Sequence, residues 1–460
     1  MLRTWQSACL DMALNKFSSG QSHFLCLATP GAGKTIMAAE VASKLKNKGL
    51  IDLVLCFSPS LTIAGSIEST FSWRLNSSFN GGIGSVGGSY TYQNMLYMPD
   101  EFWTVLKRFR VLVVFDEIHH CSGNSAIDAN AWGMEILTKI QDHAAYTLAL
   151  TGTPWRSDSQ PISLARYSNP EGEIQCDFVY GLSEAVNDGV CRSPKIVLVD
   201  NDNDNLKVTS DTEGSKSFNS IQELLMNESI PYSAIITNRD AMLYLLKLGS
   251  QKLSEIRTVN KSAGGLVVAS SVEHAREILS LLQDEFNQSA VIVTYRNDDP
   301  VGEISRFRTS DVQWIVSVGM VSEGTDIPRL QVCCHISHVK TELYFRQVLG
   351  RILRVSNAVN QEAWLYTIAE SQLSKFAERI AEDLPNENAI VNLLRDNELA
   401  VKIDESSSTK HWQSNLRATD RNAAIEIELG LSIDGVMVAN QSTVLTLGTF
   451  TQRLLSAFIF

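Results

Sequence analysis

The sequence predicts an α/β protein built on two groups of parallel strands, and three observations support that prediction. Short, fully apolar runs alternate with longer amphipathic segments along most of the chain, which is typical of parallel strands covered by helices on both faces. A stretch with fewer such runs, around residues 185–262, separates two groups of them. The length of 460 residues also exceeds one ordinary core, since a domain usually holds ~100 to 200 residues.

We expect a first domain at residues 1–185, a second at 186–385 and a small C-terminal accessory region at 386–460. The strands predicted for the first domain are FLCLA (24–28), LVLCF (53–57), VLVVF (111–115) and YTLAL (146–150). Those predicted for the second are KIVLV (195–199), LVVAS (266–270), AVIVT (290–294), WIVSV (314–318), VCCHI (332–336) and AWLYTI (363–368).

The remaining segments are read from their spacing and polarity. Residues 36–45 and 233–257 have helical spacing, whereas residues 201–220 are polar and expected to be exposed. Residues 404–415 are expected to form a loop. The chain ends on the apolar RLLSAFIF (453–460), which needs a partner or a groove on the same chain to cover it.

Composition narrows the possible function. The apolar runs are far shorter than the ~20 residues that span a bilayer and no basic-then-apolar leader opens the chain, so we expect a cytoplasmic protein. The eight cysteines are scattered without a C-x-x-C pair, which favours reduced thiols over zinc or iron–sulfur ligation. Because the net charge is −12, any binding of nucleic acid must be local.

The strongest motif is FLCLATPGAGKT (24–35), in which a strand runs into a small-residue loop and then into a helix-compatible segment. Such a loop lets backbone N–H groups surround phosphate, while Lys34 can reach the β/γ-phosphates and Thr35 can ligate magnesium. Ala28 stands where the usual pattern has glycine. A plain glycine turn beside a surface lysine is the alternative.

A second motif, VLVVFDEIHHC (111–121), places Asp116 and Glu117 at the end of a buried strand. This arrangement fits one acid that organises magnesium and one that activates water. A zinc site is disfavoured, because H-E-x-x-H needs histidines four apart on a helix, whereas His119 and His120 are adjacent.

Two further patterns are weak. GIGSVG (82–87) satisfies G-x-G-x-x-G, but no strand is predicted before it and no helix after it, so a flexible loop is favoured over dinucleotide binding. DNDNDN (200–205) resembles the start of a calcium loop, but Asn205 stands where that loop needs glycine and Asp211 where it needs a bidentate glutamate.

Five motifs in order resemble those of the superfamily 2 helicases and translocases: ATPGAGKT (28–35), DEIHH (116–120), TGTPWR (151–156), VSEGTDIP (321–328) and QVLGRILR (347–354). The set looks most like the D-E-x-H type related to restriction-enzyme translocase subunits and phage branch-migration helicases. The resemblance covers roughly residues 1–385. It implies two tandem RecA-like domains that bind ATP and Mg²⁺ between them.

The resemblance also implies roles for individual residues. The catalytic residues that it implies are Lys34, Glu117, Gln347, Arg351 and Arg354. The residues that would bind the nucleotide are Arg3, Gln6, Thr29, Gly31, Ala32, Gly33, Lys34, Thr35, Gly324 and Asp326. Magnesium would be bound by Thr35 and Asp116. The resemblance further implies that hydrolysis is coupled to domain movement through His119, Thr151 and Thr153. For Gln6, an ordinary amphipathic helix is the alternative to adenine recognition. The spacing of Arg351 and Arg354 predicts that both lie on one helix face.

Contacts to nucleic acid are expected at Pro59, Ser60, Thr91, Ser270 and Thr325. Amides and hydroxyls there could grip a sugar–phosphate backbone without a basic surface. We expect an ATP-dependent helicase or translocase acting on DNA, and the C-terminal region could dock a protein partner. The alternatives are an RNA helicase and an ATP-switched subunit of a larger restriction, defence or repair assembly.

Overall fold

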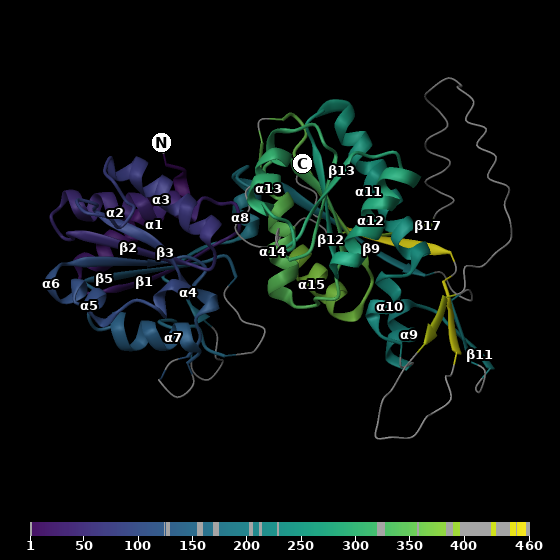
Figure 1. Cartoon of the computed structure of the whole chain (residues 1–460), viewed down its shortest axis with the longest axis horizontal. Coiled ribbons are helices and arrows are strands. Elements are labelled where there is room, and N and C mark those ends of the chain that lie inside the picture. The colour runs from purple at the N-terminus through teal and green to yellow at the C-terminus, as the bar shows by residue number, and fades with distance from the viewer. Residues whose placement is uncertain are drawn as a thin grey trace. The chain divides into compact units, whose positions relative to one another are not determined.

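The computed structural model describes residues 2–123, 125, 129–153, 160–168, 174–201, 206–210, 214–227, 230–319, 327–356, 358–382, 390–395, 425–428, 442–447 and 449–456. The chain packs into two compact units (Figure 1). Unit 1 comprises Met1–Arg192, Val321–Pro328 and Thr341–Val355, and unit 2 comprises Ser193–Met320, Arg329–Lys340 and Ser356–Phe460. The domain boundaries expected after residues 185 and 385 stay predictions, because the two units interleave along the chain.

Unit 1 is built on a parallel sheet with the strand order β3-β2-β4-β5-β1-β8. Its strands are β1 (His23–Ala28), β2 (Leu53–Ser58), β3 (Gly87–Thr91), β4 (Val111–Phe115), β5 (Tyr146–Thr151) and β8 (Phe178–Tyr180). A short antiparallel pair, β6 (Arg166–Tyr167) and β7 (Ile174–Gln175), lies apart from that sheet.

Helices cover both faces of this sheet (Figure 1). One face carries α1 (Thr4–Ser18), α2 (Lys34–Asn47) and α3 (Leu61–Leu75), and the other carries α4 (Tyr92–Met95), α5 (Asp100–Trp103), α6 (Val105–Arg108) and α7 (Ala131–Glu135). Helix α7 continues as a π-helical turn, Ile136–Ile140; a 3₁₀ turn spans Ile118–His120, and α8 (Leu182–Asn187) and α14 (Glu342–Ile352) complete the unit. Phe57, Phe115 and Trp103 are among the buried side chains between the sheet and the second group of helices.

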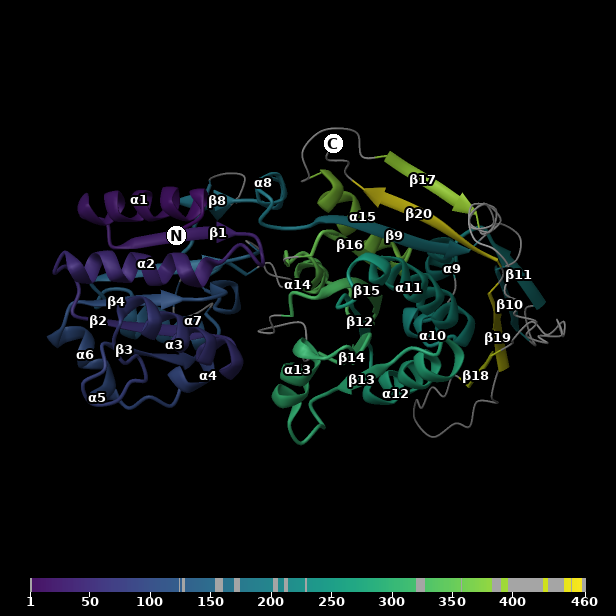
Figure 2. The same ribbon diagram turned by 90° about the horizontal axis from the view of Figure 1, so that it is seen from above.

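Unit 2 is built on an eight-stranded sheet with the order β13-β14-β12-β15-β16-β9-β20-β17. The parallel strands are β9 (Ser193–Asn201), β12 (Gly264–Ala269), β13 (Ala290–Val293), β14 (Trp314–Ser317), β15 (Leu330–Ile336) and β16 (Glu362–Ile368). Strand β20 (Phe450–Ser456) pairs antiparallel with β9, and β17 (Ile390–Arg395) pairs antiparallel with β20 (Figure 2).

The helices of unit 2 are α9 (Ile221–Asn227), α10 (Tyr232–Ile236), α11 (Arg239–Val259), α12 (Val272–Ser280) followed by a π-helical turn at Leu281–Glu285, α13 (Pro300–Thr309) and α15 (Ser371–Glu382). A smaller antiparallel sheet joins β11 (Gly214–Phe218), β10 (Leu206–Ser210), β19 (Ser442–Thr446) and β18 (Ile425–Glu428) in that order. No helix in the described part of the chain combines the length and apolar character needed to cross a bilayer.

Local chemistry explains where these elements begin and end. Helix α3 begins because the Ser60 hydroxyl accepts a hydrogen bond from the backbone N–H of Ile63, and it ends at Asn76 in the left-handed conformation. Helix α11 begins where the side chain of Asn238 accepts from the N–H groups of Asp240 and Ala241. Strand β4 is buried along its whole length, as expected for a central parallel strand.

The structure confirms the predicted α/β class with large parallel sheets, and each of the ten predicted apolar runs forms a strand. Strand β3, which begins at the last glycine of the G-x-G-x-x-G match, was not predicted from the sequence. The antiparallel pair β10–β11 within the polar stretch was not predicted either. Residues 453–456 of the terminal run RLLSAFIF form part of β20 and pair with β9 of the same chain. Residues 457–460 of that run, residues 404–415 and residues 202–205 lie outside the described residues.

Candidate functional site

The loop between β1 and α2 is held open by two glycines in the left-handed region. Gly31 has φ +86° and Gly33 has φ +95°, a backbone conformation that costs residues with a Cβ free energy. A Cβ on Gly33 would also come within 2.9 Å of Gln6 Nε2. Helix α2 begins at Lys34, directly after this turn, so the loop meets a helix N-terminus, where anions are favoured.

Arg3 and Gln6, at the start of α1, hold this loop by its carbonyl groups. The Arg3 guanidinium donates to Ala32 O at 2.7 Å, and Gln6 Nε2 donates to Gly33 O at 3.0 Å. Gln6 Oε1 accepts from the backbone N–H of Arg3 at 2.8 Å, so both ends of the amide contact protein groups. The neighbouring Trp5 is buried and stacks on Tyr180 at 4.9 Å between ring centroids.

Lys34 and Glu117 form an ion pair at the mouth of the loop. Lys34 Nζ lies 3.1 Å from Glu117 Oε1 and donates to Ala28 O at 3.2 Å. Glu117 follows the end of β4 with φ +52°, which turns the chain sharply behind Asp116. Burial opposes ionisation of Glu117, but the ammonium of Lys34 and the ring of His119 outweigh it and lower the pKa of this carboxyl group.

Asp116 is buried beside this pair. Its Oδ1 atom has no hydrogen-bond partner within the described part of the chain, and a buried carboxylate oxygen without a partner is costly. Burial and the adjacent Glu117 carboxylate raise the pKa of Asp116. A hard cation held through one carboxylate, a hydroxyl and waters suits Mg²⁺, so Asp116 and Thr35 fit that ion.

A hydrogen-bonded network links Glu117 to the end of β5. Glu117 Oε2 accepts from the backbone N–H of Gly152 at 3.0 Å and lies 3.5 Å from His119 Nδ1. His119 Nδ1 lies 3.0 Å from the Thr151 hydroxyl and 3.4 Å from the Thr153 hydroxyl. Thr151 in turn donates to Thr153 O at 2.6 Å. The three residues expected to couple hydrolysis to movement therefore contact one another, and His119 joins them to Glu117.

Side chains from α14 and from the residues directly after it belong to unit 1 as well. Gln347, Arg351 and Arg354 line one cavity together with Lys34, Thr35, Asp116 and Glu117. An added Cβ on Gly350 would lie 2.7 Å from Pro30, and one on Gly31 would lie 3.2 Å from Arg354 Cγ. Helix α14 therefore packs closely against the loop between β1 and α2, residues 29–33, which is the phosphate-type loop of this protein.

One sequence prediction about α14 is wrong. Arg351 and Arg354 do not share a helix face, because α14 ends at Ile352 and Arg354 forms an antiparallel backbone bridge with Cys191. That bridge draws the chain out of the helix one residue before Arg354. Both arginines still line the cavity.

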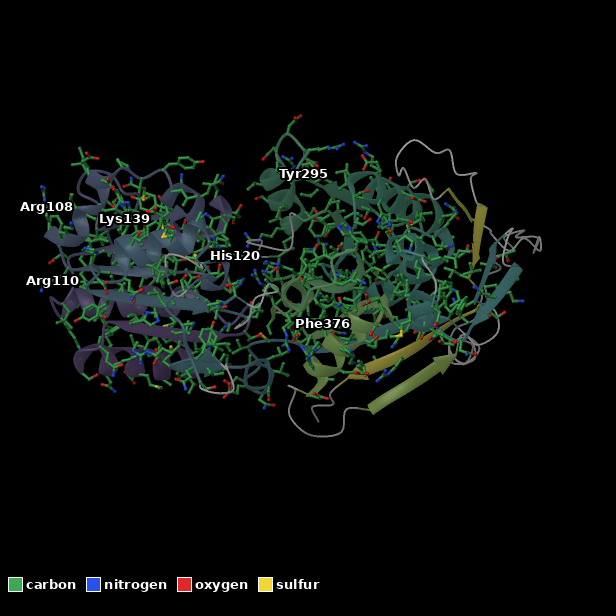
Figure 3. All side chains as sticks on the ribbon, turned by 90° about the horizontal axis from the view of Figure 1, so that it is seen from below. Arg108, Arg110, His120, Lys139, Tyr295 and Phe376 are labelled. Atoms are coloured by element: carbon green, nitrogen blue, oxygen red, sulfur yellow. The ribbon has the colours of Figure 1, made fainter. Side chains whose placement is uncertain are left out.

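The cavity has a volume of about 430 Å³. Several of its lining residues were not predicted as site residues from the sequence: Ile36, Ile63, Ser66, Thr70, His120, Val190, Pro328 and Val355. Ser66 and Thr70 are four residues apart on α3. This spacing, which places two residues on one face of a helix, is the sequence signal that could have grouped them. His120 is labelled in Figure 3. Among the described residues, no three His, Cys, Asp or Glu side chains are grouped to hold a metal ion by themselves.

The residues expected to contact nucleic acid are scattered. Pro59 lines the cavity, Ser60 caps α3, and Thr91 is buried and exchanges hydrogen bonds with Asn94. Ser270 lies in unit 2, with its hydroxyl 2.7 Å from His274 Nδ1. Gly324, Thr325 and Asp326 lie outside the described residues.

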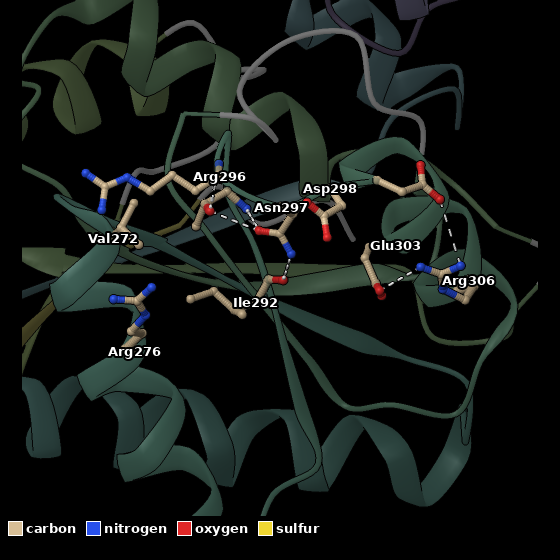
Figure 4. A pocket seen from close by; sticks show the side chains of 10 residues that line it. Val272, Arg276, Ile292, Arg296, Asn297, Asp298, Glu303 and Arg306 are labelled. Atoms are coloured by element: carbon tan, nitrogen blue, oxygen red, sulfur yellow. Dashed lines mark hydrogen bonds and ion pairs between the residues drawn. The ribbon is translucent and has the colours of Figure 1, made fainter.

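A second cavity, of about 460 Å³, lies wholly in unit 2 beside α12 and α13 (Figure 4). Arginine side chains that line this cavity form ion pairs with carboxylates in or beside its wall. Arg306 pairs with Glu303 at 2.6 Å and lies 3.9 Å from Asp299, and Arg296 lies 3.4 Å from Glu273. The predicted site residues are absent from its described lining.

The sequence is similar to a family of restriction-enzyme subunits and to several individual proteins. Residues 1–156 match the family model described as "Type III restriction enzyme, res subunit". An uncharacterized protein of Mycobacterium leprae (strain TN) is 32% identical over 367 residues, covering 77% of this chain and 59% of that protein. The DNA 3'-5' translocase XPB2 of Sulfurisphaera tokodaii is 24% identical over 358 residues, covering 70% of this chain and 73% of the translocase.

A fragment assigned as an HsdR subunit of a type I restriction enzyme from Vibrio vulnificus YJ016 has a similar fold, with a TM-score of 0.53 and 17% identity, over 82% of this chain and 65% of that one. This chain spans about three fifths of the length of the M. leprae protein. The resemblance to superfamily 2 helicases of the restriction type is confirmed by these matches.

Proposed function

We propose that this chain, a relative of the restriction-type superfamily 2 helicases, hydrolyses ATP and uses the energy to move along DNA. One observation carries the proposal. Lys34, Asp116 and Glu117 meet Gln347, Arg351 and Arg354 around a single cavity, although more than 200 residues separate the two sets in the sequence. Cations on both sides of a cavity suit a polyphosphate.

Each polar group has a distinct task in this proposal. Backbone N–H groups at residues 31–35 and the Lys34 ammonium bind the β/γ-phosphates, and Glu117 orients the attacking water and takes its proton. Arg351 and Arg354 stabilise charge that develops on the phosphates, a contribution worth ~10³ to 10⁵ in rate in related nucleotide hydrolases. Magnesium, when bound by Asp116 and Thr35, neutralises phosphate charge.

Movement is proposed to begin in the network of His119, Thr151 and Thr153. A change at Glu117 reaches the end of β5 through the Gly152 N–H and the His119 ring, so phosphate release alters the hydrogen bonds of the segment that follows. Contacts at Pro59, Ser60, Thr91, Ser270 and Thr325 then alternate their hold on the nucleic acid. DNA is favoured over RNA because the chain is 24% identical over 358 residues to a relative described as a DNA 3'-5' translocase.

Steady-state ATP hydrolysis at low salt tests the proposal, measured alone and with single-stranded DNA, duplex DNA, a branched junction and RNA. Lys34→Ala and Glu117→Gln should each lower the stimulated rate by about 10²-fold or more, while Glu117→Gln still binds ATP. Glu101→Gln, an exposed acid on α5, is the matched control and should leave the rate unchanged.

Normal turnover in Lys34→Ala or Glu117→Gln would refute the assigned site. Strong stimulation by RNA alone would replace the DNA track with an RNA track.

A second candidate is an ATP-switched subunit of a restriction or defence assembly, favoured by the match to the res subunit family over residues 1–156. In that case ATP binds but none of the nucleic acids stimulates hydrolysis by the chain alone. Deleting residues 386–460 is unsuitable as a test, because β20 pairs with β9 inside the sheet of unit 2.

A further inference from the structure

Arg192 is an unusually placed cation in unit 1. Only 1% of its surface is exposed, although arginine is among the residues that are almost never fully buried unless their charge is compensated. It ends the first of the three segments that make up unit 1, directly before β9. Burial lowers the pKa of Arg192 to about 10, which leaves the guanidinium charged at neutral pH.

The hydrogen bonds of Arg192 converge on the end of α14. Its backbone N–H donates to Leu353 O at 2.7 Å, and Nη1 donates to Ile352 O at 3.1 Å. Carbonyl groups at a helix C-terminus have no partner within the helix and carry partial negative charge, so a cation is favoured there. Nη2 donates to Pro328 O at 3.0 Å, which ties the end of the VSEGTDIP motif to the same point.

The residue before Arg192 faces the opposite way, toward the phosphate-type loop. The Cys191 thiol donates to Pro30 O at 3.6 Å, and the Cys191 backbone forms the bridge with Arg354. Residues 191 and 192 therefore connect the loop that precedes Lys34 to the two residues that follow α14. Arg354 and Arg351 lie on either side of the carbonyls that Arg192 binds.

We infer that Arg192 is a positioning residue that fixes Arg351 and Arg354 relative to the phosphate-type loop. It is absent from the described cavity lining, so it acts through the arginines rather than on the nucleotide. The inference rests on the proposed ATP hydrolysis. Its physical basis is that a catalytic group displaced by about 1 Å can lose about 10²-fold in rate.

The first test is a double-mutant cycle in nucleic-acid-stimulated ATP hydrolysis. Arg192→Met should lower kcat by about ten-fold to 10²-fold with less than about three-fold change in the KM for ATP. In an Arg354→Ala background the same substitution should lower kcat by a smaller factor than it does in the wild type, because one of the two groups that Arg192 positions is already missing. Arg192→Lys, which keeps the charge but loses the fork of two donors, should fall between wild type and Arg192→Met.

The second test does not depend on turnover. Hydrogen–deuterium exchange of the full chain should become faster at residues 341–355 in Arg192→Met, and stay unchanged in α2. Arg110→Met is the matched control, because this exposed arginine also donates to a carbonyl, Gly49 O, away from the cavity; it should change neither measurement.

Either of two results would overturn the inference: losses in Arg192→Met and Arg354→Ala that multiply in full, or unchanged exchange at residues 341–355. If Arg192→Met does not fold, Arg192→Lys serves both tests. A parent chain that shows no hydrolysis with any nucleic acid would instead count against the proposed function, and exchange would still decide the role of Arg192.

Discussion

At the scale of single residues, the candidate site depends on backbone positions that few side chains tolerate. Gly33 adopts φ +95° against Gln6, and Glu117 adopts φ +52° although it carries a Cβ. Strain of this kind persists only where the surroundings hold it. For Glu117, this conformation is stabilised by the ion pair with Lys34 and by the hydrogen bond from the Gly152 N–H.

Gly33→Ala is therefore expected to destabilise the protein by roughly 1–2 kcal/mol, the usual penalty for a Cβ in the left-handed region. The added methyl group also displaces Gln6 from Gly33 O. Urea unfolding measures the loss of free energy. Gly65→Ala on α3 is the matched control, because nothing lies within 4 Å of its added Cβ. That substitution should be neutral or stabilise by up to about 1 kcal/mol, and equal effects of the two would contradict the argument.

Site residues whose geometry is set locally were predictable from the sequence, whereas residues placed by long-range packing were not. Lys34, Asp116 and Glu117 follow directly from strand-to-loop motifs. Arg354 was misplaced on a helix, because its bridge to Cys191 joins positions that are distant in the sequence. Arg192 has no signal at all, since only the fold brings it to the end of α14.

At the scale of elements, every strand with a long apolar run was predictable, and strands without one were not. Strand β3 has the sequence GGSYT, whose glycines weaken any strand signal. In β10, the exposed Lys207 and Thr209 alternate with the buried Leu206 and Val208, whereas in β11 only Phe218 is buried. Strand β20 was read as an apolar tail needing cover, and its partner β9 lies more than 200 residues earlier.

Strand β20 is expected to stabilise unit 2 from within the sheet. Leu455 is 3% exposed and pairs in register with Ile196, so Leu455→Ala should lower the free energy of unfolding by about 2–5 kcal/mol. Urea unfolding followed by tryptophan fluorescence checks this. Val359→Ala removes aliphatic surface that is 92% exposed and should change stability by less than about 0.5 kcal/mol. A loss that small for Leu455→Ala would mean that β20 is dispensable.

At the scale of the whole molecule, both units should lose stability as the pH falls. Burial lowers the pKa of His23, His274 and His335 to about 4, whereas an unfolded histidine titrates near 6.5. Between these values the unfolded chain binds more protons, so stability is full above about pH 6.5 and falls as the pH drops toward 4. At pH 5 each histidine costs on the order of 2 kcal/mol.

Unfolding free energies at pH 7, 6 and 5 check the sign and size of this effect. His335→Gln removes one titrating group from β15 and should flatten the dependence on pH. His143→Gln, at an exposed position, is the control. An identical pH dependence in wild type and His335→Gln would show that His335 does not contribute.

The ion pair between Lys34 and Glu117 has one more consequence. With the two groups 3.1 Å apart, the lysine already has a counter-ion before any ligand arrives. A polyphosphate entering the loop must take the place of that carboxylate, so binding is an exchange of one anion for another. The same event releases Glu117 from its cation. If Glu117 is the base, as we propose, its carboxylate becomes free to act only when phosphate is there to be attacked, and the empty protein is kept from idle chemistry.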